Sequence, residues 1–543
     1  MHQLLPADYI VFVIYFIIVT WYGFYIYHKK KSKRADSKDF FLAEGSLTWW
    51  AIGASLIASN ISAEQLIGMS GSGFALGLAI SSYEWMAAAT LIIVAVFFIP
   101  VYLKNKIYTM PQFLAVRYND TVSTIMAIFW LLVYILINLT SIIYLGSLAI
   151  TAVTGIPFAW CIAGLAVFAT MVTLGGMKVI GYTDVFQVLV LIVGGLVTTY
   201  LGLSMVSEHF GYGLNILKGF SLLTEKAPSH FHMIFDASNP YYKDLPGLSI
   251  LLGGMWINNL NYWGCNQYIT QRALGADLKT ARKGILFAGF LKLLTPVIAV
   301  LPGIIVYTLY QEGAFRAEMT GTDGIIKPDH AYPTLLNLLP EGLKGLAFAA
   351  LTAAIVSSLA GKANSVSTIF SLDIYKKYFH KNATEKQLVR TGRWAVVLSM
   401  LAACLIVPSM KVLNQAYQFI QEYEGFISPG VLAVFLLGMF WKRTTAKAAL
   451  TAVILTIPLS AVLKFLPVWT NGAFPDLAFL DRMSVVFVIL VFLMIIITLQ
   501  DIKSKNKPVL IKVDVTQFRC TPGFITGSVI IVGILTFLYA VFW

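Results

Sequence analysis

Five polar side chains crowd into seven positions of an otherwise apolar stretch, residues 49–73. They are Ser59, Asn60, Ser62, Glu64 and Gln65. A carboxylate or amide at membrane depth is costly unless it faces a cavity, an ion or a partner. Backbone carbonyls freed by an unwound turn persist at that depth only where protein or water satisfies them. The stretch therefore predicts an interrupted membrane helix that holds a polar ligand, a cation or both, as broken helices do in secondary transporters.

Further polar groups lie inside other apolar runs and supply hydrogen-bond donors and acceptors of both kinds. They are Glu84, Asn259, Lys292, Gln418, Gln421 and Glu422. The last three share one helical face, at i, i+3 and i+4. Aromatic residues are interleaved with them, namely Tyr83, Tyr262, Trp263 and Tyr417. A neutral polyhydroxyl ligand needs such a set, because its hydroxyls donate and accept and its C–H face stacks on aromatic rings. The alternative is that these groups pair with one another and fix the helix packing.

Oxygen atoms suited to a hard cation occur in two of these apolar runs. The broken turn offers backbone carbonyls near Ala58 and Ile61, and Ser357 and Ser358 offer adjacent hydroxyls. Sodium prefers such oxygen ligands, but serine pairs are also common packing residues in membrane helices. Asp184 begins another apolar run, and two interpretations of it stay open. It lies on an ion exit route, or it is a helix N-terminal charge favoured by the helix dipole, which is the preferred interpretation.

The composition indicates an integral membrane protein. Of 543 residues, 58% are hydrophobic and 12% are charged, about half the charged share of soluble domains. The net charge of +13 is spread over short loops between apolar runs, so it does not predict nucleic-acid binding. The four cysteines have no metal-binding spacing and are expected to be free thiols. No histidine pair, serine–histidine set or phosphate loop lies at depth, so an enzyme is not expected.

Runs of about 20 apolar residues mark about fourteen spanning helices. We place them at 8–27, 49–70, 75–103, 121–153, 157–175, 184–204, 246–270, 284–310, 343–372, 391–408, 413–440, 446–466, 482–500 and 523–543. Most lysines and arginines fall in alternate loops, which are then cytoplasmic, so both ends of the chain are expected outside. The first run has its charge behind it, which predicts a retained helix instead of a cleaved signal. The long outer loops, 205–245 and 311–342, either form short lid helices or are plain connections.

The order of the runs suggests an internal inverted repeat. Five helices from Trp49 and five from Gly247 have opposite orientation, and each set opens with an interrupted helix. Such paired interruptions point to a site near the membrane midplane. The expected domains are an extra helix at 1–30, repeats at 49–204 and 246–440, the outer loop 205–245, and three additional helices within 441–543. The expected fold class is all-α and polytopic.

Several stretches resemble the sodium:solute symporter family along nearly the whole chain. They are residues 53–73 (GASLIASNISAEQLIGMSGSG), 82–86 (SYEWM), 259–272 (NLNYWGCNQYITQR), 349–358 (AALTAAIVSS) and 417–430 (YQFIQEYEGFISPG). The resemblance implies a five-plus-five inverted-repeat core with discontinuous helices, an amino-acid/sodium symporter-like fold, and sodium-coupled uptake by alternating access.

The resemblance also assigns roles to individual positions. The implied sugar contacts are Gln65, Glu84, Asn259, Lys292 and Gln421. The implied sodium ligands are the carbonyls of Ala58, Ile61 and Ala354 and the hydroxyls of Ser357 and Ser358. The implied inner gate is Tyr262, and the outer gate is formed by Met69, Tyr83 and Tyr417. Asp184 matches the family's ion-exit aspartate, and Glu64 receives no role beyond an expected pairing within the bundle.

Three positions depart from the pattern of the family's galactose-transporting bacterial members. Ala87 replaces a serine that contacts sugar, so one hydrogen bond is lost. Tyr417 replaces phenylalanine, which adds a hydroxyl at the outer gate. Lys362, with Gly361, replaces uncharged residues one turn beyond Ser358. The preferred interpretation is that Lys362 extends toward the cytoplasm; the alternative is that its ammonium competes with sodium.

The resulting hypothesis is a sodium symporter for a neutral hexose, galactose or glucose, in the bacterial inner membrane with both termini periplasmic. The open alternative is the same fold with another cargo: inositol or another polyol, an amino acid or an organic acid. The expected partners are sodium, the small-molecule sugar and the lipid bilayer. A monomer and a homodimer both remain open.

Overall fold

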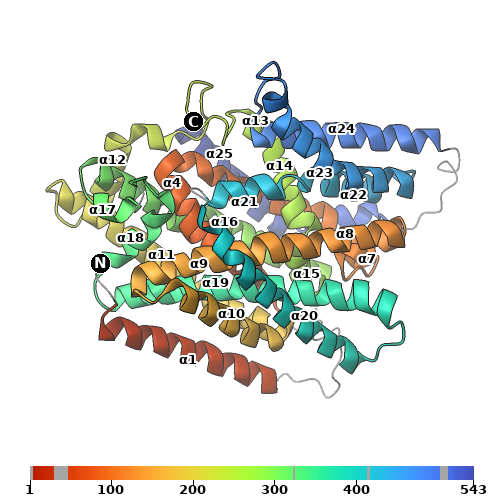
Figure 1. The fold of residues 1–543 in the computed structure, drawn as a ribbon, viewed down its shortest axis with the longest axis horizontal. Helices are drawn as coiled ribbons and strands as arrows, with labels where there is room; N and C mark the ends of the chain where they lie inside the picture. The colour runs from red at the N-terminus through yellow and green to blue at the C-terminus, as the bar shows by residue number, and fades with distance from the viewer. Residues whose placement is uncertain (1–3, 30–46, 322–323, 413–415, 502–510) are drawn as a thin grey trace.

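Helices make up almost the whole of the computed structural model, which describes residues 4–29, 47–321, 324–412, 416–501 and 511–543. Within these ranges the extended structure is one isolated bridge between Thr320 and Ile326. Long apolar runs become helices because a helix satisfies its own backbone hydrogen bonds inside lipid. The protein is therefore an all-helical, multi-pass membrane protein (Figure 1).

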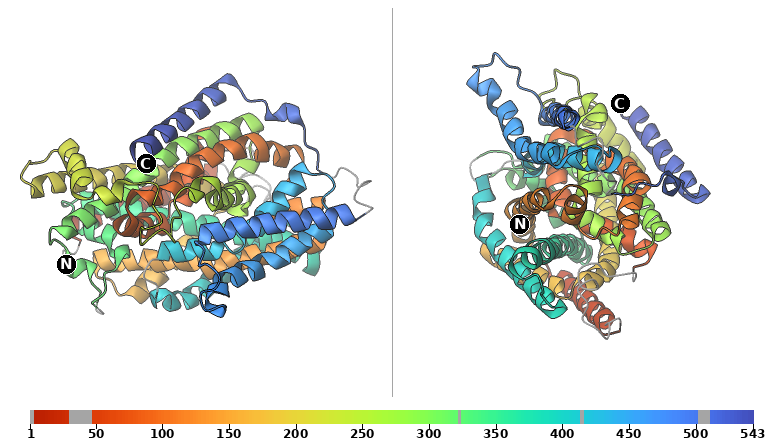
Figure 2. Two further views of the ribbon diagram at one scale, coloured as in Figure 1. Left: turned by 90° about the horizontal axis from the view of Figure 1, so that it is seen from above. Right: turned by 90° about the vertical axis from the view of Figure 1, so that its right-hand side faces the viewer.

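Ten helices in the described ranges are long and apolar enough to cross a membrane, or eleven with one bent pair. Eight are α1 (Pro6–Lys29), α11 (Met177–His209), α16 (Leu278–Gln311), α19 (Leu343–Thr368), α20 (Glu385–Ile406), α23 (Ala446–Trp469), α24 (Phe479–Gln500) and α25 (Pro522–Val541). Two are composite, Glu64–Lys104 and Asp120–Thr154. The bent pair is α21 (Ala416–Glu424) with α22 (Ser428–Phe440), at 45°. End-on, α1 and α25 lie at the periphery (Figure 2, right).

The composite spans contain several short helical segments. Residues 64–104 comprise η1 (Glu64–Met69), α4 (Ser70–Leu76), η2 (Gly77–Ser81), α5 (Ser82–Ile93), η3 (Val94–Phe98) and α6 (Ile99–Lys104). Residues 120–154 comprise α8 (Asp120–Leu132), η4 (Val133–Leu139) and α9 (Thr140–Thr154). The short α7 (Met110–Arg117) lies between them and begins with a capping box at Thr109.

The expected count of fourteen spans is not confirmed. Three predicted spans are broken or short: 49–70 is interrupted after Asn60, 157–175 is the 17-residue α10 (Phe158–Leu174), and 246–270 is divided into four pieces. Each of these segments is interrupted or too short to form one long continuous helix. The fourteen-helix count and the inverted repeat thus remain predictions.

Two helices are interrupted, as the sequence predicts for each proposed repeat. In the first, α3 (Trp49–Asn60) ends at Ile61, whose backbone is extended, and η1 resumes at Glu64. In the second, α13 (Ser249–Leu252), α14 (Gly254–Leu260) and η6 (Asn261–Cys265) lead to an extended Asn266 before α15 (Gln267–Leu274). The Asn266 side chain accepts a hydrogen bond from the backbone N–H of Tyr268. This second break comes after fully buried Cys265, later than the asparagine cluster at 258–261.

Both ends of the described chain lie at the same end of the bundle (Figures 1 and 2). The two long loops form short helices there, which decides between the two expectations for these loops. These helices are α12 (Ile216–Lys226), η5 (Pro228–Phe231), α17 (Arg316–Met319), η7 (Pro328–His330) and α18 (Ala331–Asn337).

His230 anchors one of these loops to the first broken helix. Its Nε2 donates to the carbonyl of Phe74 at 3.0 Å. Its ring stacks on Tyr307 at 3.7 Å between centroids. Burial lowers the pKa of His230, and the hydrogen bond to the Phe74 carbonyl opposes that shift. The loop is thus held on α4 by a hydrogen bond and on α16 by an aromatic contact.

Candidate functional site

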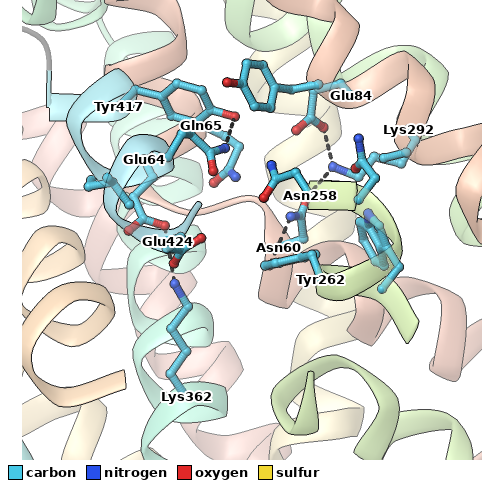
Figure 3. Close-up of a pocket in the computed structure, with 16 residues that line it drawn as sticks. Asn60, Glu64, Gln65, Glu84, Asn258, Tyr262, Lys292, Lys362, Tyr417 and Glu424 are labelled. Atoms are coloured by element: carbon cyan, nitrogen blue, oxygen red, sulfur yellow. Dashed lines mark hydrogen bonds and ion pairs between the residues drawn. The ribbon is translucent and has the colours of Figure 1, made fainter. Parts of the chain in front are cut away.

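A polar cavity lies beside the interruption of the first helix. Sixteen residues line it, and they come from α3, η1, α5, α14, η6, α16, α19 and α21 (Figure 3). All five predicted sugar contacts are among them: Gln65, Glu84, Asn259, Lys292 and Gln421. The structure therefore brings together polar residues that are up to 356 positions apart in the sequence.

Glu84 and Lys292 form a buried ion pair at one side of the cavity (Figure 3). The Lys292 ammonium also donates to Oδ1 of Asn60, and Nδ2 of Asn60 donates to the Tyr262 hydroxyl at 3.1 Å. The side chains of Lys292 and Glu84 are 1% and 4% exposed, so neither charge is stabilised by bulk water. Together they present a polar surface with no net charge, which suits a neutral ligand.

The amide side chains of the cavity are oriented by local hydrogen bonds. Oε1 of Gln65 accepts from the backbone N–H and the hydroxyl of Ser62, both at 3.0 Å. Nε2 of Gln421 donates to the Tyr417 hydroxyl at 2.8 Å. Nδ2 of Asn259 donates to the Met255 carbonyl at 3.2 Å. The unwound turn at Ser62 thus fixes the direction in which Gln65 faces the cavity.

Three of the four predicted gate residues line the cavity, and the fourth does not. Tyr83 and Tyr417 meet edge to face, with ring centroids 5.5 Å apart. Tyr262 lies below Tyr417 in Figure 3. Met69 is completely buried and is not part of the lining. Ala87 lines the cavity, so the hydroxyl it lacks would have faced the ligand.

The predicted sodium ligands lie where α3 meets α19. The Ser358 hydroxyl donates to the carbonyl of Ser59 at 2.6 Å, so the serine pair contacts the broken helix directly. Ala58 and Ile61 flank Ser59 and Asn60 in the sequence, and Ala354 is one turn before Ser358 on α19. The arrangement gathers hydroxyl and carbonyl oxygens of the kind a hard cation takes.

Asp184 lies beside these serines, and the preferred interpretation of it is wrong. Helix α11 begins at Met177, not at 184, so Asp184 is not a charge at a helix N-terminus. It is buried, and it accepts hydrogen bonds from the hydroxyls of Ser55 and Ser357. Nη2 of Arg272 lies 3.9 Å from its carboxylate. Its predicted role in ion exit remains a prediction.

The preferred interpretation of Lys362 is also wrong. Its side chain is 4% exposed and does not extend to the cytoplasm; its ammonium lies 3.3 Å from Oε2 of Glu64. The Ser141 hydroxyl donates to the other oxygen of Glu64, so Glu64 pairs within the bundle as expected. Both Lys362 and Glu64 line the cavity (Figure 3). The reason is that a buried carboxylate is within reach of the ammonium, which removes the need to extend to water.

Sequence reasoning missed several lining residues and misplaced two others. It assigned no role to Asn60, Asn258, Ile420 and Glu424. Glu422 instead pairs with Arg482 and Lys464, and Gln418 is buried outside the lining. Glu424 is three residues after Gln421, so the helical period from Gln421 would have predicted it.

Comparison with known proteins identifies the family. The model of the sodium:solute symporter family matches residues 40–456, more than half of the chain. The chain belongs to the sodium:solute symporter family. Sodium is the coupling ion of this family, and the protein is a sodium-coupled membrane transporter.

Several relatives within the family are named for a sugar or a polyol. A sodium/glucose cotransporter of Vibrio parahaemolyticus is 45% identical and is aligned over all of this chain and 99% of its own length. The human sodium/myo-inositol cotransporter 2 is 34% identical over 82% of this chain and 67% of its length.

Solved structures support the same fold. A Na⁺-coupled sialic acid symporter in a substrate-bound, outward-open state matches with a TM-score of 0.76, at 20% identity, over 91% of this chain and 98% of that one. Mhp1, a nucleobase-cation-symport-1 family transporter, matches with a TM-score of 0.51 at 14% identity, over 88% and 97%. At these identities the likeness concerns the fold alone.

Proposed function

We propose that this symporter imports a neutral hexose, galactose or glucose, together with sodium by alternating access. The observation that carries the proposal is the cavity beside the broken helix, in which Gln65, Gln421 and Asn259 face the neutral Glu84–Lys292 pair. Amides and a compensated ion pair donate and accept hydrogen bonds without attracting a net charge. Tyr262 and Trp263 add aromatic surface for the C–H face of a sugar ring. The sodium/glucose cotransporter among the relatives supports the same cargo.

We further propose that sodium couples to sugar through the broken helix. Sodium would bind the carbonyls of Ala58, Ile61 and Ala354 and the hydroxyls of Ser357 and Ser358. The ion would hold α3 against α19 and thereby position Gln65, which follows the interruption, for the sugar. Such coupling is reciprocal, so sugar must tighten sodium binding by the same factor. The gates would be Tyr262 on one side and Tyr83 with Tyr417 on the other.

A second candidate cargo is myo-inositol. It is supported by the names of several relatives and by Ala87 in the cavity lining. The human relative named for myo-inositol is 34% identical, and Ala87 removes one hydroxyl from the lining. Inositol presents hydroxyls all round its ring, so the same amides would serve it. An organic acid is disfavoured because Glu84 neutralises Lys292.

The experiment that tests the proposal is uptake into proteoliposomes. Labelled galactose should accumulate under an inward sodium gradient and should not accumulate when potassium replaces sodium. Unlabelled glucose, galactose and myo-inositol are then compared as competitors. Equal galactose uptake in sodium and potassium would contradict symport, and stronger competition by myo-inositol than by either hexose would transfer the assignment to inositol.

We place the protein in the bacterial plasma membrane with both termini periplasmic. The loop charges support this orientation, since lysine and arginine favour the cytoplasmic side. The two termini lie at one end of the bundle (Figure 1), in agreement with an even number of passes. A monomer and a homodimer remain equally compatible with this arrangement.

A further inference from the structure

The broken helix is attached to α19 at two points, four residues apart on α19. The first is the hydrogen bond from the Ser358 hydroxyl to the Ser59 carbonyl, at 2.6 Å. The second is the ion pair between the Lys362 ammonium and Oε2 of Glu64, at 3.3 Å. Ser358 belongs to the proposed sodium site, whereas Lys362 and Glu64 do not. One attachment thus lies where a mobile cation would bind, and the other contains a cation fixed to the chain.

The Lys362–Glu64 pair is largely buried at the wall of the cavity. The two side chains are 4% and 10% exposed. Glu64 also accepts from the hydroxyls of Ser62 and Ser141, and the Lys362 ammonium lies 5.6 Å from the centroid of the Tyr268 ring. The pair therefore joins the broken helix and α19 to α9 and α15 in a medium that screens charge weakly.

A second carboxylate faces the same ammonium. Glu424 on α21 lines the cavity and accepts a hydrogen bond from Nδ2 of Asn138. It interacts electrostatically with both Lys362 and Glu64. Figure 3 shows the three side chains at one end of the cavity, opposite the Glu84–Lys292 pair. Lys362 is thus the cation that offsets repulsion between carboxylates from two different helices.

We propose that Lys362 is a resident cation that holds the broken helix on α19 alongside the transported sodium, and so sets how strongly sugar binding depends on sodium. The proposal rests on the sodium-coupled sugar binding proposed above. A ligand shifts a conformational equilibrium only by its differential affinity for the two states. The Lys362 ammonium already favours the state in which the broken helix lies on α19. Sodium binding therefore increases the population of that state by a smaller factor. Lys362 acts through Glu64 and is a positioning residue.

The test compares sugar affinity with and without sodium. Equilibrium binding of labelled galactose to purified protein in lipid nanodiscs is measured in sodium chloride and in choline chloride. The ratio of the two dissociation constants, choline over sodium, is the coupling factor. In K362M the coupling factor should rise by about tenfold, within the usual range of coupling between sites. The rise should come from binding in choline, which should weaken about tenfold more than binding at saturating sodium.

Four further variants separate positioning from general disruption. E64Q removes the partner carboxylate and should raise the coupling factor as K362M does. The double variant should show no further rise, because the two residues act through one contact. K362R keeps the charge and should keep the wild-type factor. K104M removes a lysine that pairs with Asp514 at 2.7 Å, away from the cavity lining, and should also leave the factor unchanged.

Each remaining outcome decides against the proposal or between the two proposals. An unchanged coupling factor in K362M, or equal weakening in both salts, overturns the role of Lys362. If K362M does not fold, E64Q carries the same test. A factor of one in the wild type and in every variant contradicts sodium coupling itself. A wild type that binds no galactose in either salt contradicts only the hexose assignment, and the series is then measured with labelled myo-inositol.

Discussion

Two glutamines of α21, three residues apart, have different surroundings. Gln421 lines the cavity and donates to the Tyr417 hydroxyl. Gln418 is buried away from the lining, and within the described structure neither polar atom of its amide has a hydrogen-bond partner. The two residues have the same chemistry on the same helix. They therefore separate a contact with the ligand from a general effect of truncating a buried amide.

We expect Gln421→Ala to weaken galactose binding and Gln418→Ala to leave it within about twofold. Losing a hydrogen bond to a ligand in a buried site costs about 1–3 kcal/mol, which is about 5- to 150-fold in the dissociation constant. Equilibrium binding of labelled galactose in sodium chloride measures both variants. Equal losses in the two variants, or none in Gln421→Ala, would remove Gln421 from the site.

At the level of single residues, the sequence predicted the cavity better than its internal pairs. Gln65, Glu84 and Lys292 stand out because each is polar within an apolar run. The Lys362–Glu64 contact does not, because its partners are 298 positions apart and no local spacing connects them. Without that partner, a lysine in a membrane helix is expected to extend its ammonium toward water, which is why the preferred interpretation of Lys362 was wrong.

Helix α16 packs unusually closely on α4, the outer half of the broken helix. A Cβ added at Gly303 would lie 1.9 Å from the carbonyl oxygen of Ser70. That oxygen belongs to the backbone, so α4 and α16 would have to separate. By contrast, a Cβ added at Gly164 on α10 would meet nothing within 4 Å. The close approach at Gly303 holds the broken helix beside Lys292, which projects from the same α16.

Gly303→Ala should destabilise the protein by about 1–3 kcal/mol, the usual cost of overpacking. Gly164→Ala should be neutral or slightly stabilising, because alanine favours the helix over glycine. Thermal unfolding followed by size-exclusion chromatography in detergent compares the two. Identical melting temperatures would show that α4 and α16 separate without cost.

Helix boundaries were harder to predict than helix existence. The run that was expected to begin at Asp184 forms a helix from Met177. The less apolar residues 177–183 are thus helical as well, and hydropathy alone did not predict this. The second interruption comes after Cys265 and not within the asparagines at 258–261. Asparagine side chains can bond within a helix or to neighbouring helices, so their presence alone does not locate a break. Nδ2 of Asn261, for example, donates to the Ser428 hydroxyl.

Across the whole molecule, helices outside the two proposed repeats brace the outer gate. Glu422, on the opposite side of α21 from the cavity, pairs with Arg482 of α24 and with Lys464 of α23. The end of α25 also reaches the outer loop, where the Met233 N–H donates to the Phe542 carbonyl at 2.7 Å. The bent pair α21–α22 is therefore held by ion pairs to α23 and α24. Such tertiary contacts follow from packing, and the sequence alone did not predict them.

The thiol of Cys265, at the second interruption, is a native probe of conformational change during transport. All four cysteines are free, and Cys265 is fully buried at the point where η6 ends, three residues after Tyr262. A movement of α15 that opens a path past Tyr262 is expected to expose this sulfur, since Cys265 directly precedes the break. Alkylation kinetics would therefore follow the inner gate without any engineered label.

We expect N-ethylmaleimide to modify Cys265 faster in sodium with galactose, when the protein cycles, than in sodium alone. The partly exposed Cys404 and Cys520 provide internal references whose rates should not change, and peptide mass spectrometry distinguishes the sites. A Cys265 rate that is the same in both conditions would mean that the chain does not open at this break. Cys265 would then mark a part of the site that stays closed while the protein transports.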